Sequence, residues 1–346
     1  MKRRNFLQKA SLGSLGLGLL PEILNAKTTS AKYEKSNLVT VTKDGTDIHF
    51  FSEKIIDPAK ITFLTDTHLH KKDERELPFQ QFSKRMANAY NKTRHFQTGE
   101  VTNPEKAFEN ALKHAKESGS ELIVLGGDIF SFPSEASIEW AFNKLEQNGI
   151  PYIYVAGNHD WHYEGMKGPM EDLRDEWIEK RLLPFYQGKN PLMASHDLNG
   201  IRFVTIDNST YQISKEQLIF FRSQVEQDVP MVLIMHIPLY APGKSVGFGC
   251  GHPEWGAEND RNFELERRPQ WPKKGHTNTT FQFHREVFEA PNLLGVFAGH
   301  IHQSSMELIK GKPQFVADDN ASGGYLDVHF NPMLQKDKKL LLLCQH

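Results

Sequence analysis

Five short apolar segments of this sequence end in side chains that can bind metal ions or carry protons. Each segment consists mainly of Val, Ile, Leu, Phe, Tyr or Met, which is typical of a buried β-strand. The polar residues that follow are, in chain order, Asp66 and His68, Asp128, Asn158 and His159, His236, and His300 and His302. One such residue alone would be explained as a helix cap or a solvated side chain. Five segments with the same kind of ending favour a single site at one edge of a sheet.

The residue types restrict the chemistry of this site. Carboxylates, an Asn carbonyl and imidazoles are nitrogen and oxygen ligands that suit Mn, Fe or Zn. In Asp66-x-His68 and His300-x-His302, an extended backbone would point both side chains the same way, since strand side chains alternate with a period of two. The set is too large for one tetrahedral ion. We therefore expect two divalent or transition metal ions that share a bridging carboxylate.

The elements that must position these residues alternate between strand and helix. Residues 61–65, 121–125 and 151–156 are predicted strands, and helices capped by Asn103 and Ser134 separate them. This alternation predicts a largely parallel central sheet with its functional loops at one edge. Further strands are predicted at 38–41, 47–51, 192–195, 201–207, 231–235 and 293–298, and a final meander at 306–309, 314–317, 325–330 and 340–343.

Two long segments do not fit this alternation. Residues 71–103 are charged and partly helical, whereas residues 240–278 are rich in Gly, Pro and Trp without periodicity and predict a functional loop or lid. Within the second, residues 247–252 and Trp255 are either part of a substrate-binding lid or a surface loop with one buried Trp.

Length and composition set the remaining bounds. The 346 residues, 38% of them hydrophobic, suffice for one large domain or two modest ones. A formal net charge of -2 does not favour binding to nucleic acid. The two cysteines, Cys250 and Cys344, exclude a Cys-based zinc site, and they either pair with each other or stay free.

The first residues have the pattern of a targeting segment. Arg3 and Arg4 are followed by Asn-Phe-Leu and by an apolar run at 11–20 that is too short to span a bilayer. This pattern predicts a twin-arginine export signal at 1–26, a linker at 27–37 and one domain at 38–346. The expected partner is the twin-arginine export machinery, the expected location is the periplasm or the exterior, and no stable membrane span is expected in the mature chain.

The blocks TDTH, GGD, GNHD, MH and GHIH, in this order between residues 61 and 302, resemble the signature of the calcineurin-like metallophosphoesterase superfamily. The resemblance implies an α/β fold, a four-layer α/β/β/α sandwich with a dinuclear centre at the strand ends. It also implies a ligand set in which Asp128 bridges the two metals. The implied ligands of one metal are Asp66, His68, Asp128 and His302, and those of the second are Asp128, Asn158, His236 and His300.

The activity implied by the resemblance is hydrolysis of a small phosphate mono- or diester by attack of a metal-bridging hydroxide. His159 would be the catalytic residue that protonates the leaving oxygen or stabilises its charge. Ser131 stands where purple acid phosphatases carry a Tyr as an iron ligand, so their charge-transfer colour is not expected. Protein Ser/Thr phosphatases carry an Asp at this position, so protein phosphatase activity is not expected. The alternatives are a nuclease or amidase that uses the same dinuclear site, and a non-catalytic binding protein on this fold.

Overall fold

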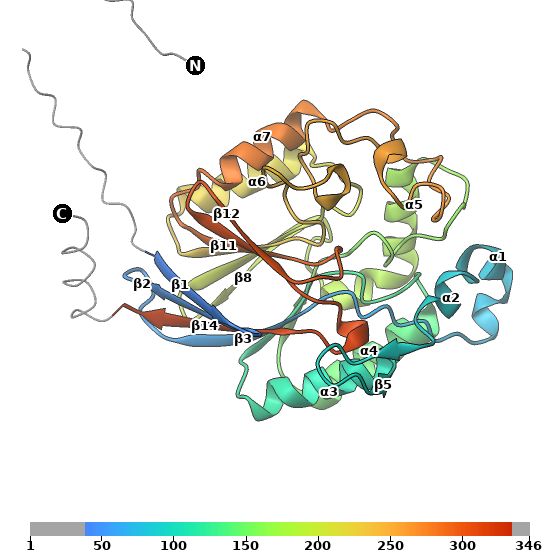
Figure 1. Ribbon diagram of the computed structural model, residues 1–346, viewed down its shortest axis with the longest axis horizontal. Coiled ribbons are helices and arrows are strands. Elements are labelled where there is room, and N and C mark those ends of the chain that lie inside the picture. The colour runs from blue at the N-terminus through green and yellow to red at the C-terminus, as the bar shows by residue number, and fades with distance from the viewer. Residues whose placement is uncertain (1–38, 334–346) are drawn as a thin grey trace, which may run out of the picture. The chain divides into compact units, whose positions relative to one another are not determined.

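The computed structural model describes residues 39–333, and within them the strands form two six-stranded sheets and one two-stranded sheet (Figure 1). The first sheet has the order β1 (Val39–Asp44), β2 (Asp47–Ser52), β14 (Leu326–Pro332), β3 (Ala59–Leu64), β6 (Leu122–Leu125), β7 (Tyr152–Tyr154). The second has the order β12 (Ser305–Ile309), β13 (Lys312–Val316), β11 (Leu293–Ala298), β10 (Met231–Ile234), β9 (Ile201–Ile206), β8 (Met193–Leu198). The predicted export signal at 1–26, the linker at 27–37 and the strand at 340–343 lie outside the described residues.

The expectation of one central sheet was wrong, since the strands form two large sheets. Strands such as β6 are buried on both faces, and their side chains point alternately into one hydrophobic core between the sheets and another under the helices. On β6, Leu122 and Val124 face the core between the sheets, whereas Ile123 and Leu125 face the helices. A fully apolar strand gives no sequence signal of which sheet it joins. The prediction of a final meander was also wrong. The strand β14 does not pair with β13 but lies in the first sheet, parallel to β2 and antiparallel to β3.

Helices cover the outer face of each sheet. The helices α3 (Pro104–Glu117) and α4 (Glu135–Asn148) lie along the first sheet, and α6 (Lys215–Glu226) and α7 (Asn278–Val287) lie along the second (Figure 1). The expected four-layer α/β/β/α sandwich is therefore confirmed. No helix within residues 39–333 combines the length and the apolar character that crossing a bilayer requires.

The predicted helix starts are present as caps. The Asn103 side chain accepts the Lys106 N–H, with Pro104 at the first helical position. The Ser214 and Gln217 side chains form a reciprocal capping box at the start of α6. These signals were readable because a cap involves only neighbours in the chain.

The two irregular segments contain little regular structure. Residues 71–103 hold a 3-10 helix (Glu74–Phe79), α1 (Gln80–Ser83), α2 (Met86–Ala89), β4 (Thr93–Arg94) and β5 (Val101–Thr102). Residues 240–277 hold 3-10 turns at Val246–Phe248 and Ala257–Asn259. Between β7 and β8 lie α5 (Met170–Trp177), a π-helical turn (Ile178–Leu182) and a 3-10 turn (Leu183–Tyr186), and a last 3-10 turn (Asn320–Ser322) precedes β14.

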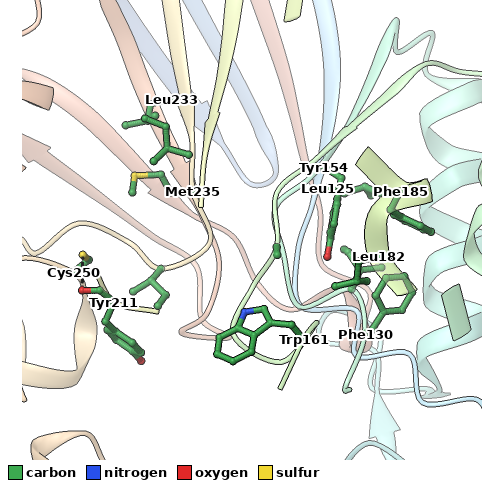
Figure 2. Close-up of a cluster of buried hydrophobic side chains, with 14 of the residues drawn as sticks. Leu125, Phe130, Tyr154, Trp161, Leu182, Phe185, Tyr211, Leu233, Met235 and Cys250 are labelled. Carbon is green, nitrogen blue, oxygen red and sulfur yellow. Dashed lines mark hydrogen bonds between the residues drawn. The ribbon is translucent and has the colours of Figure 1, made fainter. Parts of the chain in front are cut away.

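Trp161 packs between residues of the two six-stranded sheets, near the ends of their strands. It is fully buried and belongs to the hydrophobic cluster that contains Leu125 of β6 and Leu233 of β10. Figure 2 shows its ring between the side chains around Phe130 and Tyr154 and those around Tyr211. The GNHD block is thus followed directly by a core anchor that holds the strand ends in place.

Candidate metal centre

The carboxyl ends of strands from both sheets bring the predicted residues together. Asp66, His68 and His302 form one group, and Asp128, His236 and His300 form a second, each with ligand atoms within 4.8 Å of one another. The strands β3 and β6 belong to the first sheet and β10 and β11 to the second. The site therefore lies where the ends of the two sheets meet.

In the first group, two imidazoles converge on the Asp66 carboxylate. His302 Nε2 lies 3.1 Å from Asp66 Oδ1, and His68 Nε2 lies 3.9 Å from the same oxygen. The two Nε2 atoms are 3.1 Å apart. Three ligand atoms this close to one another suit a single ion.

The second group is centred on Asp128. His236 Nε2 lies 3.1 Å from Asp128 Oδ2, and the ring centroids of His236 and His300 are 5.3 Å apart. His236 Nε2 also lies 3.9 Å from Asp66 Oδ1, so the two groups adjoin. Asn158 is fully buried at the end of β7. The bridging role of Asp128 and the ligand role of Asn158 stay predictions.

The backbone of the ligand segments differs from the expected extended conformation. The φ angle is 54° at Asp66, 55° at His68, 50° at Asp128, 71° at His300 and 57° at His302. Such left-handed conformations at non-glycine residues cost about 1–2 kcal/mol each. They are held by main-chain hydrogen bonds between strand ends, such as Asp66 N–H to Gly127 C=O at 2.9 Å and His68 N–H to Asp128 C=O at 2.9 Å.

Two glycines of the sequence blocks are required by close approach to the carboxylates. A Cβ at Gly157 would overlap Asp128 Oδ1, and a Cβ at Gly299 would overlap Asp66 Oδ2. The next residue after Gly299 donates its N–H to the same Asp66 oxygen, at 2.9 Å. The glycines therefore let one strand end contact the carboxylate of another.

Asp160, the last residue of GNHD, ties the β6 and β7 ends together. Its Oδ2 accepts the N–H groups of Asp128 at 2.9 Å and Gly157 at 2.7 Å, and its Oδ1 accepts that of Phe130 at 2.7 Å. Its carboxylate is fully buried and is occupied by the backbone. The sequence analysis gave Asp160 no role, although its position beside His159 was a signal.

The residues fit a metal centre, because several of their buried polar atoms make no hydrogen bond within the described part of the chain. Buried polar atoms normally find a hydrogen-bond partner. Within residues 39–333, several that do not are atoms of the predicted ligands. These are Asp66 Oδ1, His68 Nδ1, Asn158 Oδ1 and Nδ2, and His236 Nε2. Except for Asn158 Nδ2, they are atom types that coordinate cations, so the donor set suits nitrogen- and oxygen-bound ions.

The charges of the site also favour cations. Burial would raise the pKa of the Asp128 carboxyl, but His236 and His159 hold it well below its usual value. Burial would likewise lower the pKa of His236, yet Asp128 and Asp66 raise it to about 10. The two carboxylates thus stabilise a positive charge on the neighbouring imidazole. A metal cation would compete with the imidazole proton for binding to the His236 nitrogen.

His159 lies beside the two groups and not within them. Its ring centroid is 5.3 Å from that of His68, and its backbone N–H donates to Asp128 Oδ1 at 2.8 Å. Burial would lower the pKa of His159, but Glu266 and then Asp128 raise it to about 9. The imidazole therefore carries a proton near neutral pH and is able to donate it.

A cavity of about 220 Å³ opens onto the site. It is lined by Arg85, Met86, Ala89, Tyr90, Asp128, His159, Arg261, Asn262, Leu265, Glu266, His300 and His302. Tyr90 stacks on His68 with ring centroids 4.3 Å apart. The lining thus combines residues of the predicted site with residues from both irregular segments, so both segments border the site.

Several contributors were missed by sequence analysis. Tyr211 O–H donates to Asp260 at 2.9 Å, and its oxygen lies 2.6 Å from His300 Nε2, so Tyr211 joins this imidazole to Asp260 and helps to orient it. Glu266 contacts His159 across 3.5 Å. Glu266 and Asp260 lie in the irregular segment 240–278, and Tyr211 contacts it. The unusual length of this segment was the only sequence signal that pointed to them.

Other residues considered from the sequence lie away from the cavity. Trp255 is buried between the rings of Tyr211 and His276, which agrees with a buried Trp and leaves it unable to stack on a substrate. His70 contacts the His68 carbonyl. Ser131 donates to that same carbonyl at 2.9 Å. Cys250 is buried, and Cys344 lies outside the described residues, so their pairing is not tested.

Comparison with known proteins places these features in a family. The family profile described as Calcineurin-like phosphoesterase matches residues 59–304. A dimetal phosphatase from Danio rerio has a similar fold, with a TM-score of 0.50, 10% identity and coverage of 80% of this chain and 94% of that chain. At this identity the structural likeness bears on the fold alone.

Two curated relatives carry the name probable cyclic nucleotide phosphodiesterase. The protein from Psychrobacter sp. (strain PRwf-1) is 26% identical over 258 residues, which are 66% of this chain and 66% of that protein. The protein from Psychrobacter arcticus (strain DSM 17307 / VKM B-2377 / 273-4) is 35% identical over 92 residues, or 26% of this chain and 28% of that protein. The chain thus spans just under two thirds of the first relative's length and less of the second.

Proposed function

The chain belongs to the calcineurin-like phosphoesterase family, and from this premise we propose that it hydrolyses a small phosphate mono- or diester at a dinuclear metal centre. The observation that carries the proposal is the pair of adjoining carboxylate and imidazole groups, centred on Asp66 and Asp128, at the base of one cavity. Arg261 lines the cavity and suits an anionic substrate, as does Arg85, which also lines it and pairs with Glu164.

The ligands in this proposal are those of the two groups with Asn158 added. Asp66, His68 and His302 would hold one ion, and Asn158, His236 and His300 the other, with Asp128 shared. Two bound divalent ions would supply Lewis acidity that activates a water and neutralises the phosphate oxygens.

His159 is the proposed proton donor. In hydrolysis, a water oxygen forms a bond to phosphorus, the ester P–O bond breaks with its electron pair on the leaving oxygen, and that oxygen takes up a proton. His159 borders the cavity and its pKa is raised to about 9, so it holds the required proton. The Asp128 carboxylate fixes the His159 backbone through its N–H.

Cyclic nucleotides are one candidate class of substrate, because the two curated relatives are named probable cyclic nucleotide phosphodiesterases. A cavity of about 220 Å³ is of a size that suits a compact ester. The net charge of -2 does not favour the nuclease alternative. The complete set of ligand types and His159 speaks against a binding protein that has lost its chemistry.

A panel of substrates tests the proposal. Protein freed of metal and then loaded with Mn, Fe or Zn is assayed on aryl phosphate monoesters, aryl diesters, cyclic nucleotides, nucleotide sugars and aryl amides. We expect metal-dependent hydrolysis of at least one phosphate ester. Hydrolysis of amides alone would favour the amidase alternative, and tight binding of an ester without turnover would favour the binding protein.

We further propose that the chain is exported by the twin-arginine route, on the basis of Arg3 and Arg4 and the apolar run at 11–20. Replacing both arginines by lysines should leave the protein in the cytoplasm, as followed by cell fractionation of a bacterial host with a twin-arginine system. Unchanged export of the double-lysine variant would overturn this proposal and leave the proposed activity unaffected.

A further inference from the structure

A buried ionic cluster from the irregular segment lies against His159. The cluster comprises Asp260, Glu266 and Arg268, whose side chains are all nearly inaccessible to solvent. Charged side chains are rarely buried unless they are paired, because their removal from water is costly. Three of them next to the predicted proton donor call for an explanation.

Glu266 connects the cluster to His159 through its two oxygens. Glu266 Oε1 lies 3.5 Å from His159 Nε2, and Oε2 accepts Arg268 Nε–H at 2.8 Å together with a second Arg268 N–H. One carboxylate thus contacts an imidazole on one side and a guanidinium on the other. The remaining imidazole nitrogen, His159 Nδ1, has no hydrogen-bond partner within residues 39–333.

Arg268 is itself held from several directions. Its guanidinium lies over the Trp271 ring, 4.4 Å from the centroid, and 3.6 Å from Asp260 Oδ2. Trp271 stacks on Trp161, two residues beyond His159, with centroids 5.8 Å apart. The carboxylate of Glu266 is therefore fixed relative to the same chain segment that carries His159.

We propose that Glu266 is a positioning residue for the reaction, which holds the His159 imidazole in its orientation beside the cavity. This proposal rests on the proposed function, because it assigns to His159 the protonation of the leaving oxygen. Glu266 supplies no atom to the products. The competing explanation is that Glu266 serves only as the counter-ion that keeps Arg268 buried.

Leaving-group dependence separates these explanations. p-Nitrophenol leaves readily without a proton, whereas phenol depends more on protonation. In Glu266→Gln, we expect kcat for phenyl phosphate to fall by roughly 10- to 100-fold and kcat for p-nitrophenyl phosphate to change by less than about 3-fold. In a His159→Ala background, Glu266→Gln should cause little further loss. Equal losses on both esters, or losses that multiply in the double variant, would overturn the proposal.

Two further variants control for folding. Glu264→Gln alters an exposed carboxylate two residues away and should leave both esters unaffected. Glu266→Gln/Arg268→Met removes two of the three buried charges, keeps the stem over Trp271 and leaves no unpaired guanidinium, while Asp260 keeps the hydrogen bond from the Tyr211 hydroxyl. If Glu266→Gln does not fold, this double variant should show the same loss specific to phenyl phosphate. Full phenyl phosphate activity in the double variant would overturn the proposal.

A spectroscopic readout does not depend on activity. In zinc-loaded protein, the imidazole ¹⁵N shifts of His159 should move in Glu266→Gln and stay unchanged in Glu264→Gln, with zinc content equal in both. Unmoved shifts would overturn the positioning role. If the wild type hydrolysed no ester at all, the proposed function would fail, and these shifts would still decide whether Glu266 acts on His159.

Discussion

The strand ends and the segment 257–271 supply side chains to the same cavity but hold them by different forces. At the strand ends, main-chain hydrogen bonds such as Asp66 N–H to Gly127 C=O fix the backbone, including its left-handed residues. In the segment, main-chain hydrogen bonds form only local turns, and side-chain contacts among Asp260, Glu266 and Arg268 add to them. The ligand positions thus rest mainly on main-chain pairing, with the Asp160 carboxylate as an additional tie, whereas the segment relies on its ionic cluster in addition to local turns.

The largest effect should come from the strand ends. Asp128→Asn removes the negative charge at the centre of the second group but keeps an oxygen to accept the His159 N–H. We expect turnover to fall to the level of the uncatalysed reaction and bound metal, measured by elemental analysis, to drop. The fold should persist, since the main-chain bonds of β3 and β6 remain, and circular dichroism checks this. Full activity in this variant would refute the bridging assignment.

His159→Ala comes next in size. We expect it to slow turnover by about 10²- to 10⁴-fold, the usual contribution of a general acid, with metal content unchanged. Steady-state kinetics and elemental analysis on the same preparation measure both quantities. A loss of metal would show that His159 belongs to the ligand set and that its assignment as proton donor is wrong.

A smaller effect is expected where the two regions touch at Tyr211. Tyr211→Phe removes the hydroxyl that joins His300 to Asp260, and loss of such a support typically weakens metal affinity by about 10- to 100-fold. Metal titration by calorimetry measures the change. Tyr186→Phe is the matched control, because the Tyr186 hydroxyl is buried without a hydrogen-bond partner among residues 39–333 and lies outside this cavity. Equal affinities in the two variants would contradict a supporting role for Tyr211.

The smallest effect concerns the pH dependence of the irregular segment. His276 accepts the Gly251 N–H at 2.9 Å and stacks on Trp255, with centroids 4.4 Å apart. Burial, reinforced by His252 and His284, lowers its pKa from 6.5 to about 4. Between these values the unfolded chain binds the extra proton, so the free energy of unfolding falls as pH drops below 6.5.

We expect His276 to account for about 2 kcal/mol of stability lost between pH 7 and pH 5. Urea unfolding of the wild type and of His276→Gln at both pH values measures the difference. The variant should lose less stability on acidification. An identical loss in both proteins would show that His276 does not titrate as its burial implies.

Sequence reasoning succeeded where the physical cause lies between chain neighbours. The Asn103 and Ser214 caps, the strand positions and the order of polar residues at strand ends all have local signals. It failed where neighbours in space decide. The pairs Asp66-x-His68 and His300-x-His302 were expected to be extended, but contacts with other strand ends hold them in left-handed conformations. No local signal in the sequence indicated that β14 pairs within the first sheet, between β2 and β3.

What the sequence determined by itself is the set of candidate ligands, their order and the glycines that make room for them. Only the tertiary structure decided that these residues converge from two sheets, that Tyr211 meets His300 across 89 positions of chain, and that Glu266 reaches His159. The physical reason is that ligand type is a property of single residues. Orientation and protonation depend on burial and on partners that packing brings from distant parts of the chain.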